Sequence, residues 1–546
     1  MKVNLRIVGM LVAPLPIFAL AAPMAGATVS PAAAGRVLMA AEAAPAQALA
    51  QATHTGAVAS GQQLGLEISL QPRNQAKLAA FIKAVSDPKS TSYKHYLTVA
   101  QYAAEYAPTA AQIAQVTSYL KSEGLSVGAL TANHLTLAAS GTAAQAEKAF
   151  DVSIDTYKSA HQDFYANTAA PSLPASIASV VTGVAGLNNV ALHTSYLDKD
   201  AAGSKAVTPH AGTTLTPTLA REGYNLTTDL SDGYNGSGKT IALAEFSAYS
   251  ASDVAKYNTN YSLGVTAASV VKVDGGTTDT SGEDEDELDI EVDYALAPKA
   301  TVKVYEAPNS DAGEVALYSA LASADTTSVS SSWGEPETEE DNLSSDDADF
   351  AEMAAQGQSM FAASGDSGAK DNGSSLSVDY PASDQYVSGV GGTQLTVTSG
   401  AWKSETAWSD SGGGISTEYT TPSYQTAVNS GSYRDVPDVA AAGGNNSPWY
   451  IYTEGEWTDV WGTSAAAPNW AAFVADYDTA ATSLGGSKFG YVNSFIYPIG
   501  EGSLYTTVFH DITSGNNGGY SAKTGYDEVS GWGSYNAGQF IADELG

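Results

Sequence analysis

The sequence predicts an α/β protein of two units: a parallel sheet with helices on both faces from about residue 218 onward, and a smaller α+β unit before it. Two observations predict this division. In the later part of the chain, short apolar runs alternate with helical patterns, which is typical of strands joined by crossover helices. The earlier part combines amphipathic helical stripes with strands that alternate polar and apolar residues. A chain of 546 residues is long enough for both units.

The smaller unit is expected from about residue 60 to about residue 190, after an Ala-rich stretch. Its helical stripes consist of Leu78, Phe81, Ile82 and Val85, and then of Ile113, Val116 and Leu120 before Gly124. LGLEISL (64–70) and HLTLAAS (134–140) alternate as strands do, and we expect both helices to cover one face of their sheet. The Pro-, Ala- and Thr-rich stretch from about 195 to 217 predicts an exposed linker of the kind that a protease cuts.

Four apolar runs predict the central strands of the larger unit. They are KTIALAEF (239–246), ATVKVYEA (300–307), TTSVSSSW (326–333) and QSMFAASG (358–365). In such a sheet, functional sites lie beyond the carboxyl ends of the strands.

The N-terminus has the layout of a secretory signal peptide, which we place at residues 1–27. Lys2 and Arg6 precede an apolar run broken by Pro14 and Pro16, and Ala25-Gly26-Ala27 follows as a small-residue cleavage site. A lipid-anchored or uncleaved N-terminus is the alternative. The chain has no cysteine, which excludes disulfides, thiolate metal sites and cysteine nucleophiles. We therefore expect a secreted, extracellular protein that does not act at a membrane.

Acidic residues are concentrated in the larger unit. Residues 205–546 hold 12 Lys and Arg against 48 Asp and Glu, whereas residues 1–204 hold 12 against 11. So acidic a surface repels phosphates, which argues against a nucleic-acid partner. Because most of these carboxyl groups would be neutral in acid, the composition also favours an acidic working environment. Simple solubility or salt tolerance is the alternative explanation.

Residues 461–468, WGTSAAAP, are typical of a nucleophilic serine, Ser464, at the start of a buried helix. A serine hydroxyl needs a neighbouring base, most often histidine. From residue 205 onward the only histidines are His210, in the expected linker, and His510, without a visible acidic partner upstream. We therefore expect a carboxylate base, although a plain turn into a helix would also explain these eight residues.

The acid-rich run GEDEDELDIEVDYALAP (282–298) supplies candidates for this base. As a helix, it has an apolar stripe at Leu288, Val292, Ala295 and Leu296, and only Glu285 and Asp289 among its acids fall near the middle of that stripe. Two inward carboxyl groups in contact share a proton and titrate as a pair. Asp284, Glu287 and Glu291 are expected to face solvent. The alternative is that the whole run is a solvated face.

Asp366 lies in AASGDSGAK (362–370), at the end of a predicted strand. A protonated carboxyl group there would donate a hydrogen bond to a developing oxyanion. The GDSG pattern is also common in turns without chemistry.

Together these residues make the chain resemble the sedolisins, the serine-carboxyl peptidases that include kumamolisin. The resemblance covers most of the chain, and these further segments carry it: SDPKSTSYKHYLT (86–98), SSSWGEPE (330–337), DYPASDQYVSGVGGT (379–393), SGGGIS (411–416) and RDVPDVAA (434–441). It implies a subtilisin-like α/β catalytic domain at residues 205–546 and a ferredoxin-like α+β activation propeptide within residues 28–204.

The resemblance also implies roles for single residues. Ser464 would be the nucleophile, Glu285 its general base and later acid, Asp289 the residue that orients Glu285, and Asp366 the oxyanion-hole donor. Glu245 and Trp333 would extend the carboxyl network, and the SSWG strand would pair with the substrate backbone. Core packing is the simpler explanation for Trp333.

The segment 510–534 resembles the calcium loop of the sedolisins, which implies one structural Ca²⁺. Its oxygen ligands would be the side chains of Asp511 and Asp527 and the backbone carbonyls of Ile512, Lys523 and Gly525. Lys523 stands where the family usually has glycine, and Trp461 stands where it often has a small residue.

The expected protein is thus a secreted, acid-active peptidase made as a zymogen, a monomer whose partners are protein or peptide substrates and its own propeptide. Two alternatives remain open: a His-dependent subtilisin-like peptidase, and a non-catalytic acidic surface or binding protein on a hydrolase scaffold.

Overall fold

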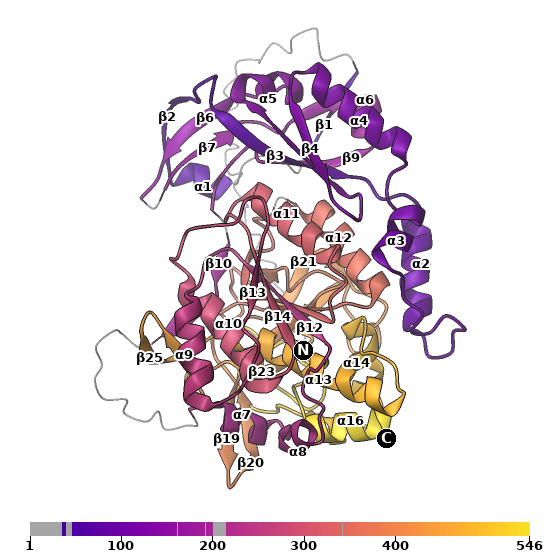
Figure 1. The fold of residues 1–546 in the computed structure, drawn as a ribbon, viewed down its shortest axis with the longest axis vertical. Helices are drawn as coiled ribbons and strands as arrows, with labels where there is room; N and C mark the ends of the chain where they lie inside the picture. The colour runs from indigo at the N-terminus through magenta and orange to yellow at the C-terminus, as the bar shows by residue number, and fades with distance from the viewer. Residues whose placement is uncertain (1–34, 40–45, 161, 192, 200–213, 341) are drawn as a thin grey trace, which may run out of the picture.

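The chain folds into two units, seen in a computed structural model that describes residues 35–39, 46–160, 162–191, 193–199, 214–340 and 342–546. The first unit lies across one end of the second (Figure 1). The predicted signal peptide falls outside the described residues, as does most of the predicted linker. No helix in the described part of the chain has the length and apolar character needed to cross a bilayer.

The first unit is built on a four-stranded antiparallel sheet of order β4-β5-β3-β9. The strands are β3 (Gln63–Leu70), β4 (Ser126–Leu130), β5 (Thr136–Thr142) and β9 (Val181–Ala185). Two helices pack on it, α4 (Ala110–Ser122) and α5 (Ala143–Phe150). This order and the helical crossovers give the ferredoxin-like arrangement. Both strands expected from their alternating residues are confirmed as β3 and β5.

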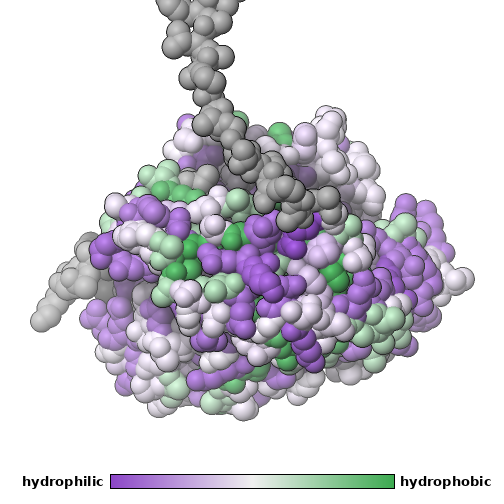
Figure 2. Space-filling view, turned by 90° about the horizontal axis from the view of Figure 1, so that it is seen from above, coloured by the Kyte–Doolittle hydropathy of each residue, from purple (hydrophilic) through white to green (hydrophobic). Residues whose placement is uncertain are grey.

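Smaller elements complete the first unit. They are β1 (Arg36–Leu38), which pairs with β8 (Ser172–Pro174), the sheet of β2 (Thr53–Ala57), β6 (Ile154–Lys158) and β7 (Asp163–Asn167), and the helices α1 (Ala46–Ala50) and α6 (Ala175–Ala178). Figure 2 views the molecule from the side of this unit. Where grey atoms do not cover it, polar residues dominate and apolar residues occur in small separate groups.

One helical stripe has a different partner from the one expected. Helix α2 (Gln75–Ser86) packs with α3 (Val99–Glu105) against α12 (Leu343–Gln356) of the second unit, and does not cover the sheet of its own unit. Leu78 and Ile82 are buried there beside Ala351 and Ala355. The stripe correctly indicated a buried face, but the surface it covers belongs to the other unit.

The second unit contains an eight-stranded sheet of order β13-β14-β12-β15-β17-β19-β20, with β23 also paired to β19. All pairings are parallel except that of β20. The strands are β12 (Thr240–Glu245), β13 (Ser269–Lys272), β14 (Thr301–Glu306), β15 (Ser328–Ser331), β17 (Ser359–Ala363), β19 (Ser388–Thr398), β20 (Ala401–Ala407) and β23 (Val439–Ala442). The four predicted central strands are therefore confirmed as β12, β14, β15 and β17.

Helices cover both faces of this sheet, as alternate residues of β12 show. Ile241 and Leu243 join the core formed with α10 (Glu283–Leu296) and α13 (Ala466–Leu484). Ala242 and Ala244 join the opposite core, with α11 (Asp311–Ala322) and α12. Because both faces are buried, the strand is apolar throughout.

The remaining elements surround the sheet and the helices that cover it. The helices are α7 (Pro217–Gly223), α8 (Thr227–Ser231), α9 (Ala251–Tyr261), the 3-10 turn η2 (Thr463–Ala465), α14 (Val492–Gly500), α15 (Tyr505–Val508) and α16 (Ala537–Leu545). The strands are β16 (Trp333–Pro336), β18 (Asp379–Tyr380), β21 (Gly414–Thr420), β22 (Tyr433–Val436), β24 (Trp449–Thr453), β25 (Glu456–Trp461), β26 (Phe509–His510) and β27 (Ser534–Tyr535).

The segment that follows the first unit is paired with the second unit where the structure describes it. It forms two short strands, β10 (Thr194–Ser195) and β11 (Asp198–Lys199), which pair antiparallel with β16 and β25 of the second unit. Tyr196 between them is buried. Thr194, Asp198 and Lys199 are exposed, as expected of a linker, but the strand pairing and the burial of Tyr196 were not expected. Backbone pairing with the second unit is available without any particular side-chain pattern.

A half-buried lysine also holds the two units together. Lys94 Nζ donates hydrogen bonds to the carbonyl oxygens of Lys488 (2.9 Å) and Phe489. Burial lowers the pKa of Lys94 to about 8. Tyr96 fills the space above Gly490, where an added Cβ would overlap its hydroxyl oxygen.

Candidate active site

Ser464 lies in the turn η2, directly before helix α13 and beyond the end of the central strands. Gly462 precedes this turn with φ +152°, and a Cβ built on it would lie 1.9 Å from the carbonyl oxygen of Tyr196. A side chain at position 462 would therefore close the space beside the serine. This explains the glycine in the Gly-Thr-Ser sequence.

The Ser464 hydroxyl has a carboxylate as its hydrogen-bond partner. Ser464 Oγ donates to Glu285 Oε2 over 2.9 Å, and both residues are fully buried. His510 is engaged elsewhere, with its ring stacked on Trp402 at a centroid distance of 4.2 Å. The structure thus joins the serine to the acid-rich helix that the sequence indicated.

The other acids of that helix are not on a solvent face. Glu287 and Glu291 are buried, contrary to expectation, and Asp284 is half-buried. The reason is that α10 is packed on all sides, by α7, α9, α13, β12 and β24. Polar partners compensate for part of this burial: Glu287 accepts from the N–H of Ser250, and Glu291 from the N–H of Tyr452.

Glu285 belongs to a group of buried carboxyl groups that extends to Glu245 on β12. Burial raises the pKa of Glu285 well above its ordinary value, and the charge of Glu245 raises it further. The same two causes raise the pKa values of Asp286 and Asp289. Burial raises the pKa of Glu245 to about 7. Such a group holds protons that it shares, because adjacent buried carboxylates do not all ionise.

Two side-chain donors bind carboxyl groups of this cluster. Trp333 Nε1 donates to Glu245 Oε2 (2.7 Å), so the indole has a polar role in addition to packing. Ser332 Oγ lies 2.9 Å from both carboxyl oxygens of Asp289. Asp289 and Glu285 share no hydrogen bond among the described residues, and Glu285 affects Asp289 through its charge.

Asp366 lies on the other side of the serine turn. Its Oδ1 accepts from both the backbone N–H and the hydroxyl of Thr463, each at 2.8 Å. Oδ2 is buried and has no partner among the described residues. Burial raises the pKa of Asp366 well above its ordinary value, which favours a proton on this group. A protonated Oδ2 would be a hydrogen-bond donor beside Gly462, in the space that the Tyr196 carbonyl also borders.

The cleft contains residues 194–199 of the chain itself. The N–H of Tyr196 donates to the carbonyl of Ser332 (3.2 Å), and the N–H of Ser464 donates to the carbonyl of Tyr196 (3.4 Å). The hydroxyl of Tyr196 donates to Asp379 Oδ2. This segment therefore lies as an added strand along the SSWG segment, the geometry expected of a bound peptide.

Comparisons with known proteins identify the family of the chain. Residues 50–190 match the family described as pro-kumamolisin, activation domain, and residues 277–490 match the subtilase family. Kumamolisin of Bacillus sp. (strain MN-32) is 32% identical over 526 residues, which cover 89% of this chain and 92% of that protein. The chain belongs to the sedolisin family. Sedolisin of Pseudomonas sp. (strain 101) is 29% identical over 521 residues, which cover 87% of this chain and 86% of that protein.

A solved structure extends the agreement to the fold. The structure of Pseudomonas sedolisin, a serine-carboxyl proteinase, in complex with two molecules of pseudo-iodotyrostatin aligns with a TM-score of 0.55 and 26% identity. The alignment covers 61% of this chain and 98% of that one. This sedolisin-family chain is a serine-type peptidase that carries its own activation domain, and its substrates are peptides.

The C-terminal loop of this sedolisin-family chain gathers oxygen atoms. Asp511 Oδ1 accepts from the N–H of Gly525 (3.1 Å), and Asp527 Oδ2 accepts from the N–H of Lys523 (2.9 Å). The carbonyl oxygens of Ile512, Lys523 and Gly525 accept no hydrogen bond among the described residues. Carboxylates and carbonyl oxygens that accept no hydrogen bond are the ligand types that a hard cation prefers.

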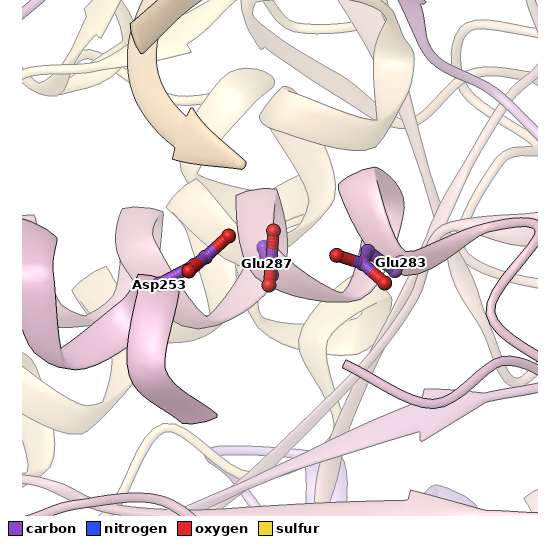
Figure 3. A group of neighbouring side chains, drawn as sticks. All are labelled: Asp253, Glu283 and Glu287. Atoms are coloured by element: carbon purple, nitrogen blue, oxygen red, sulfur yellow. The ribbon is translucent and has the colours of Figure 1, made fainter. Parts of the chain in front are cut away.

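Two other acidic groups have the geometry of a possible metal site. Figure 3 shows Asp253 of α9 beside Glu283 and Glu287 of α10, with one oxygen of each within 4.8 Å of the others. Glu314, Glu340 and Asp346 form a second group, which is fully buried. The first group is partly exposed, and such surface groups often hold no ion.

Three residues of this site were not predicted from the sequence: Ser332, Asp286 and Tyr196. Ser332 directly precedes the SSWG tryptophan, so its position beside the site was available from that motif. Asp286 had no such signal, because only Glu285 and Asp289 fell near the middle of the predicted apolar stripe. Tyr196 enters the site because its segment pairs with the second unit, which no residue pattern indicates.

Proposed function

We propose that this chain is the precursor of a secreted, acid-active serine-carboxyl peptidase in which Ser464 is the nucleophile and Glu285 its general base. The hydrogen bond of 2.9 Å from Ser464 Oγ to Glu285 Oε2 carries the proposal. A serine whose proton is already directed to a carboxylate is poised for acyl transfer.

In the proposed reaction Ser464 Oγ attacks the carbonyl carbon of the scissile bond and Glu285 takes the proton. The N–H of Ser464 and the protonated Oδ2 of Asp366 stabilise the developing oxyanion. Glu285 then returns its proton to the leaving amine, and water hydrolyses the acyl-enzyme by the same steps in reverse order. Glu285 needs a suitable protonation state and orientation for both proton transfers. In the proposed site these are maintained by Asp289, Glu245 and Trp333.

The pH dependence follows from these two protonation states. Glu285 works as a base only after losing its proton, and Asp366 donates only while it keeps its own. Activity is therefore expected in a window bounded below by the titration of Glu285 and above by that of Asp366. Burial raises the pKa of Glu285 in the precursor. Water entering the cleft after the first unit leaves would move this pKa toward the ordinary acid range, which supports activity in acid.

The proposed precursor has three parts. Residues 1–27 are a signal peptide, residues 28–204 the activation propeptide and residues 205–546 the catalytic domain. The mature protein is proposed to be an extracellular monomer that acts on proteins or peptides, without a nucleic-acid or membrane partner. The excess of acidic over basic residues from 205 onward supports the exclusion of nucleic acid.

We also propose one structural Ca²⁺ in the C-terminal loop. Asp511 and Asp527 would supply carboxylate oxygens, and Ile512, Lys523 and Gly525 backbone carbonyls. The ion would fix this loop and take no part in the chemistry. The nearby Lys523 side chain is directed to Glu528 (3.3 Å), which supports a role for its backbone alone.

Three variants test the catalytic assignment in the full-length chain. Ser464→Ala and Glu285→Gln are expected to lower hydrolysis of a denatured protein at about pH 4 by about 10⁴-fold or more. Glu283→Gln, at a half-buried position in the first turn of the same helix, is the matched control and keeps the activity. Full activity in Glu285→Gln would contradict the proposed base.

A histidine-dependent mechanism is tested separately. His510→Ala is expected to leave turnover unchanged, because the His510 ring stacks on Trp402 away from the serine. A large loss of turnover with calcium binding intact would overturn the carboxylate mechanism.

A further inference from the structure

The chain places one of its own peptide bonds in the candidate active site. On the N-terminal side of Tyr196, Thr194 pairs with Gly334 and Ser195 with Trp333. On the C-terminal side, Asp198 pairs with Trp461 and Lys199 with Val460. Strand pairing thus fixes the segment on both sides of the bond between Tyr196 and Leu197.

The carbonyl group of Tyr196 occupies the position where an oxyanion would form. Its oxygen accepts from the N–H of Ser464, and the N–H of Tyr196 donates to Ser332. A Cβ built on Gly462 would meet this oxygen at 1.9 Å and Asp366 Oδ2 at 2.7 Å, so both oxygens border the same small space. The two proposed oxyanion donors therefore converge on this carbonyl.

Side chains on both sides of the bond between Tyr196 and Leu197 also have partners in the second unit. The Tyr196 ring is buried and its hydroxyl reaches Asp379. Beyond the bond, Lys199 Nζ pairs with Asp284 (2.8 Å) and Glu454 (2.9 Å). No other residue of the described segment 193–199 presents its carbonyl to the N–H of Ser464.

We infer that the bond between Tyr196 and Leu197 is the first bond that this peptidase cuts, and that each molecule cuts its own. This inference rests on the function proposed above. Ser464 Oγ bonds to the carbonyl carbon of Tyr196 while its proton passes to Glu285. The bond from that carbon to the nitrogen of Leu197 breaks, and Glu285 protonates the nitrogen. Water then hydrolyses the ester, which leaves a carboxyl group on Tyr196 and frees Ser464.

The experiment follows the first cleavage in purified full-length chain brought to about pH 4. We expect a new N-terminus at Leu197 by N-terminal sequencing, and a matching C-terminus at Tyr196 by intact mass. Because the cleaved segment already lies in its own cleft, the rate constant of this first cut is expected not to change over a tenfold dilution. A first cut at another bond, or a rate proportional to protein concentration, would overturn the inference.

A pair of variants at position 197 sharpens the test. Leu197→Pro places a rigid ring on the leaving nitrogen and is expected to slow this cut by about 10²-fold, because it misplaces the reacting atoms. Leu197→Val is the matched control and is cut at the same bond as the unaltered chain. Equal rates of cutting at this bond in Leu197→Pro and Leu197→Val would contradict the inference.

Failure of the inference and failure of the proposed function give different results. If the processed enzyme hydrolyses added peptides but was first cut elsewhere, only the assignment of this bond is wrong. If cleavage occurs at Leu197 in the Ser464→Ala chain, the proposed nucleophile is wrong. Cleavage at Leu197 that requires Ser464 supports both.

Discussion

His193 of the first unit lies against Glu314 of helix α11, with its Nε2 atom 3.5 Å from Glu314 Oε1, and both side chains are buried. The imidazole also stacks on Phe246 at a centroid distance of 4.4 Å. Burial lowers the pKa of His193 to about 4, although the nearby Glu340 and Asp311 oppose this shift. Burial raises the pKa of Glu314 to about 8. The pair is therefore neutral in the docked precursor between these values.

The buried, neutral His193 weakens docking of the first unit in acid. A released His193 takes up a proton near its ordinary pKa of 6.5, so its contribution to docking is lost as the pH falls from about 6.5 to about 4, on the order of 3 kcal/mol. His193→Phe keeps the ring stacking and removes the proton site. We expect the midpoint pH of activation, measured as the appearance of peptidase activity, to fall by about one unit. The exposed His54→Phe is the control, and a midpoint that stays or rises would contradict the prediction.

The catalytic unit should be more stable in acid than at neutral pH. Burial raises the pKa of Glu287 to about 8 and that of Glu245 to about 7, and also raises those of Asp289 and Asp293. These groups bind protons more tightly in the folded state, so their contribution is complete below pH 4 and is lost as the pH rises toward 8.

Tryptophan fluorescence measures this prediction directly, because all 8 tryptophans lie after residue 332. In the Ser464→Ala chain, we expect the thermal midpoint of the fluorescence transition to be several degrees higher at about pH 4 than at about pH 7. A higher midpoint at pH 7 would show that these carboxyl groups ionise without loss of stability.

The sequence predicted the fold and part of the site for identifiable physical reasons. Strands β12, β14, β15 and β17 were evident because a strand buried on both faces is a short apolar run. Glu285 was found because the scarcity of histidine directed the search to acids on an apolar stripe. The same reasoning failed for Glu287, since it assumed that α10 has a solvent face. The stripe of α2 showed that a face is buried but not what buries it.

The contact between Tyr196 and Asp379 predicts the side chain that the enzyme prefers before the scissile bond. A phenol hydroxyl can donate to Asp379, whereas a phenyl ring leaves this buried carboxyl group unpaired. We expect kcat/KM of the processed enzyme to be about 10-fold higher for a peptide with Tyr at this position than for the matched Phe peptide. Asp379→Leu should abolish this ratio. A ratio that persists in Asp379→Leu would place the selecting group elsewhere.

Asp366→Asn tests whether this carboxyl group acts as a proton-bearing donor. An amide oxygen can keep both hydrogen bonds from Thr463 while the amide nitrogen donates from the position of Oδ2. The loss of kcat/KM on the alkaline side of the pH profile is therefore expected to disappear in Asp366→Asn. Asp366→Leu is the contrasting variant, in which kcat/KM falls by about 10²-fold to 10³-fold at every pH. An unchanged alkaline limb in Asp366→Asn would assign that limb to another group.

Removal of Ca²⁺ should lower stability without altering the catalytic pH profile. With free Ca²⁺ at 100 times its dissociation constant, the expected stabilisation is about 2.7 kcal/mol. Chelation should remove it, and Asp511→Asn should lose most of it, whereas Glu528→Gln, in the same loop but outside the proposed ligand set, should respond as the unaltered chain does. A calcium response in Asp511→Asn equal to that of the unaltered chain would contradict the proposed ligand set.

The strand pairing on either side of Tyr196 has a consequence for the time course of activation. Cutting the bond after Tyr196 does not break the pairing of β10 with β16 or of β11 with β25. Lys94 and His193 also keep their partners. The nicked molecule is therefore a latent two-chain complex whose cleft is still filled by its first product. Peptidase activity should appear after a lag that follows dissociation of the first unit, and not at the moment of the cut.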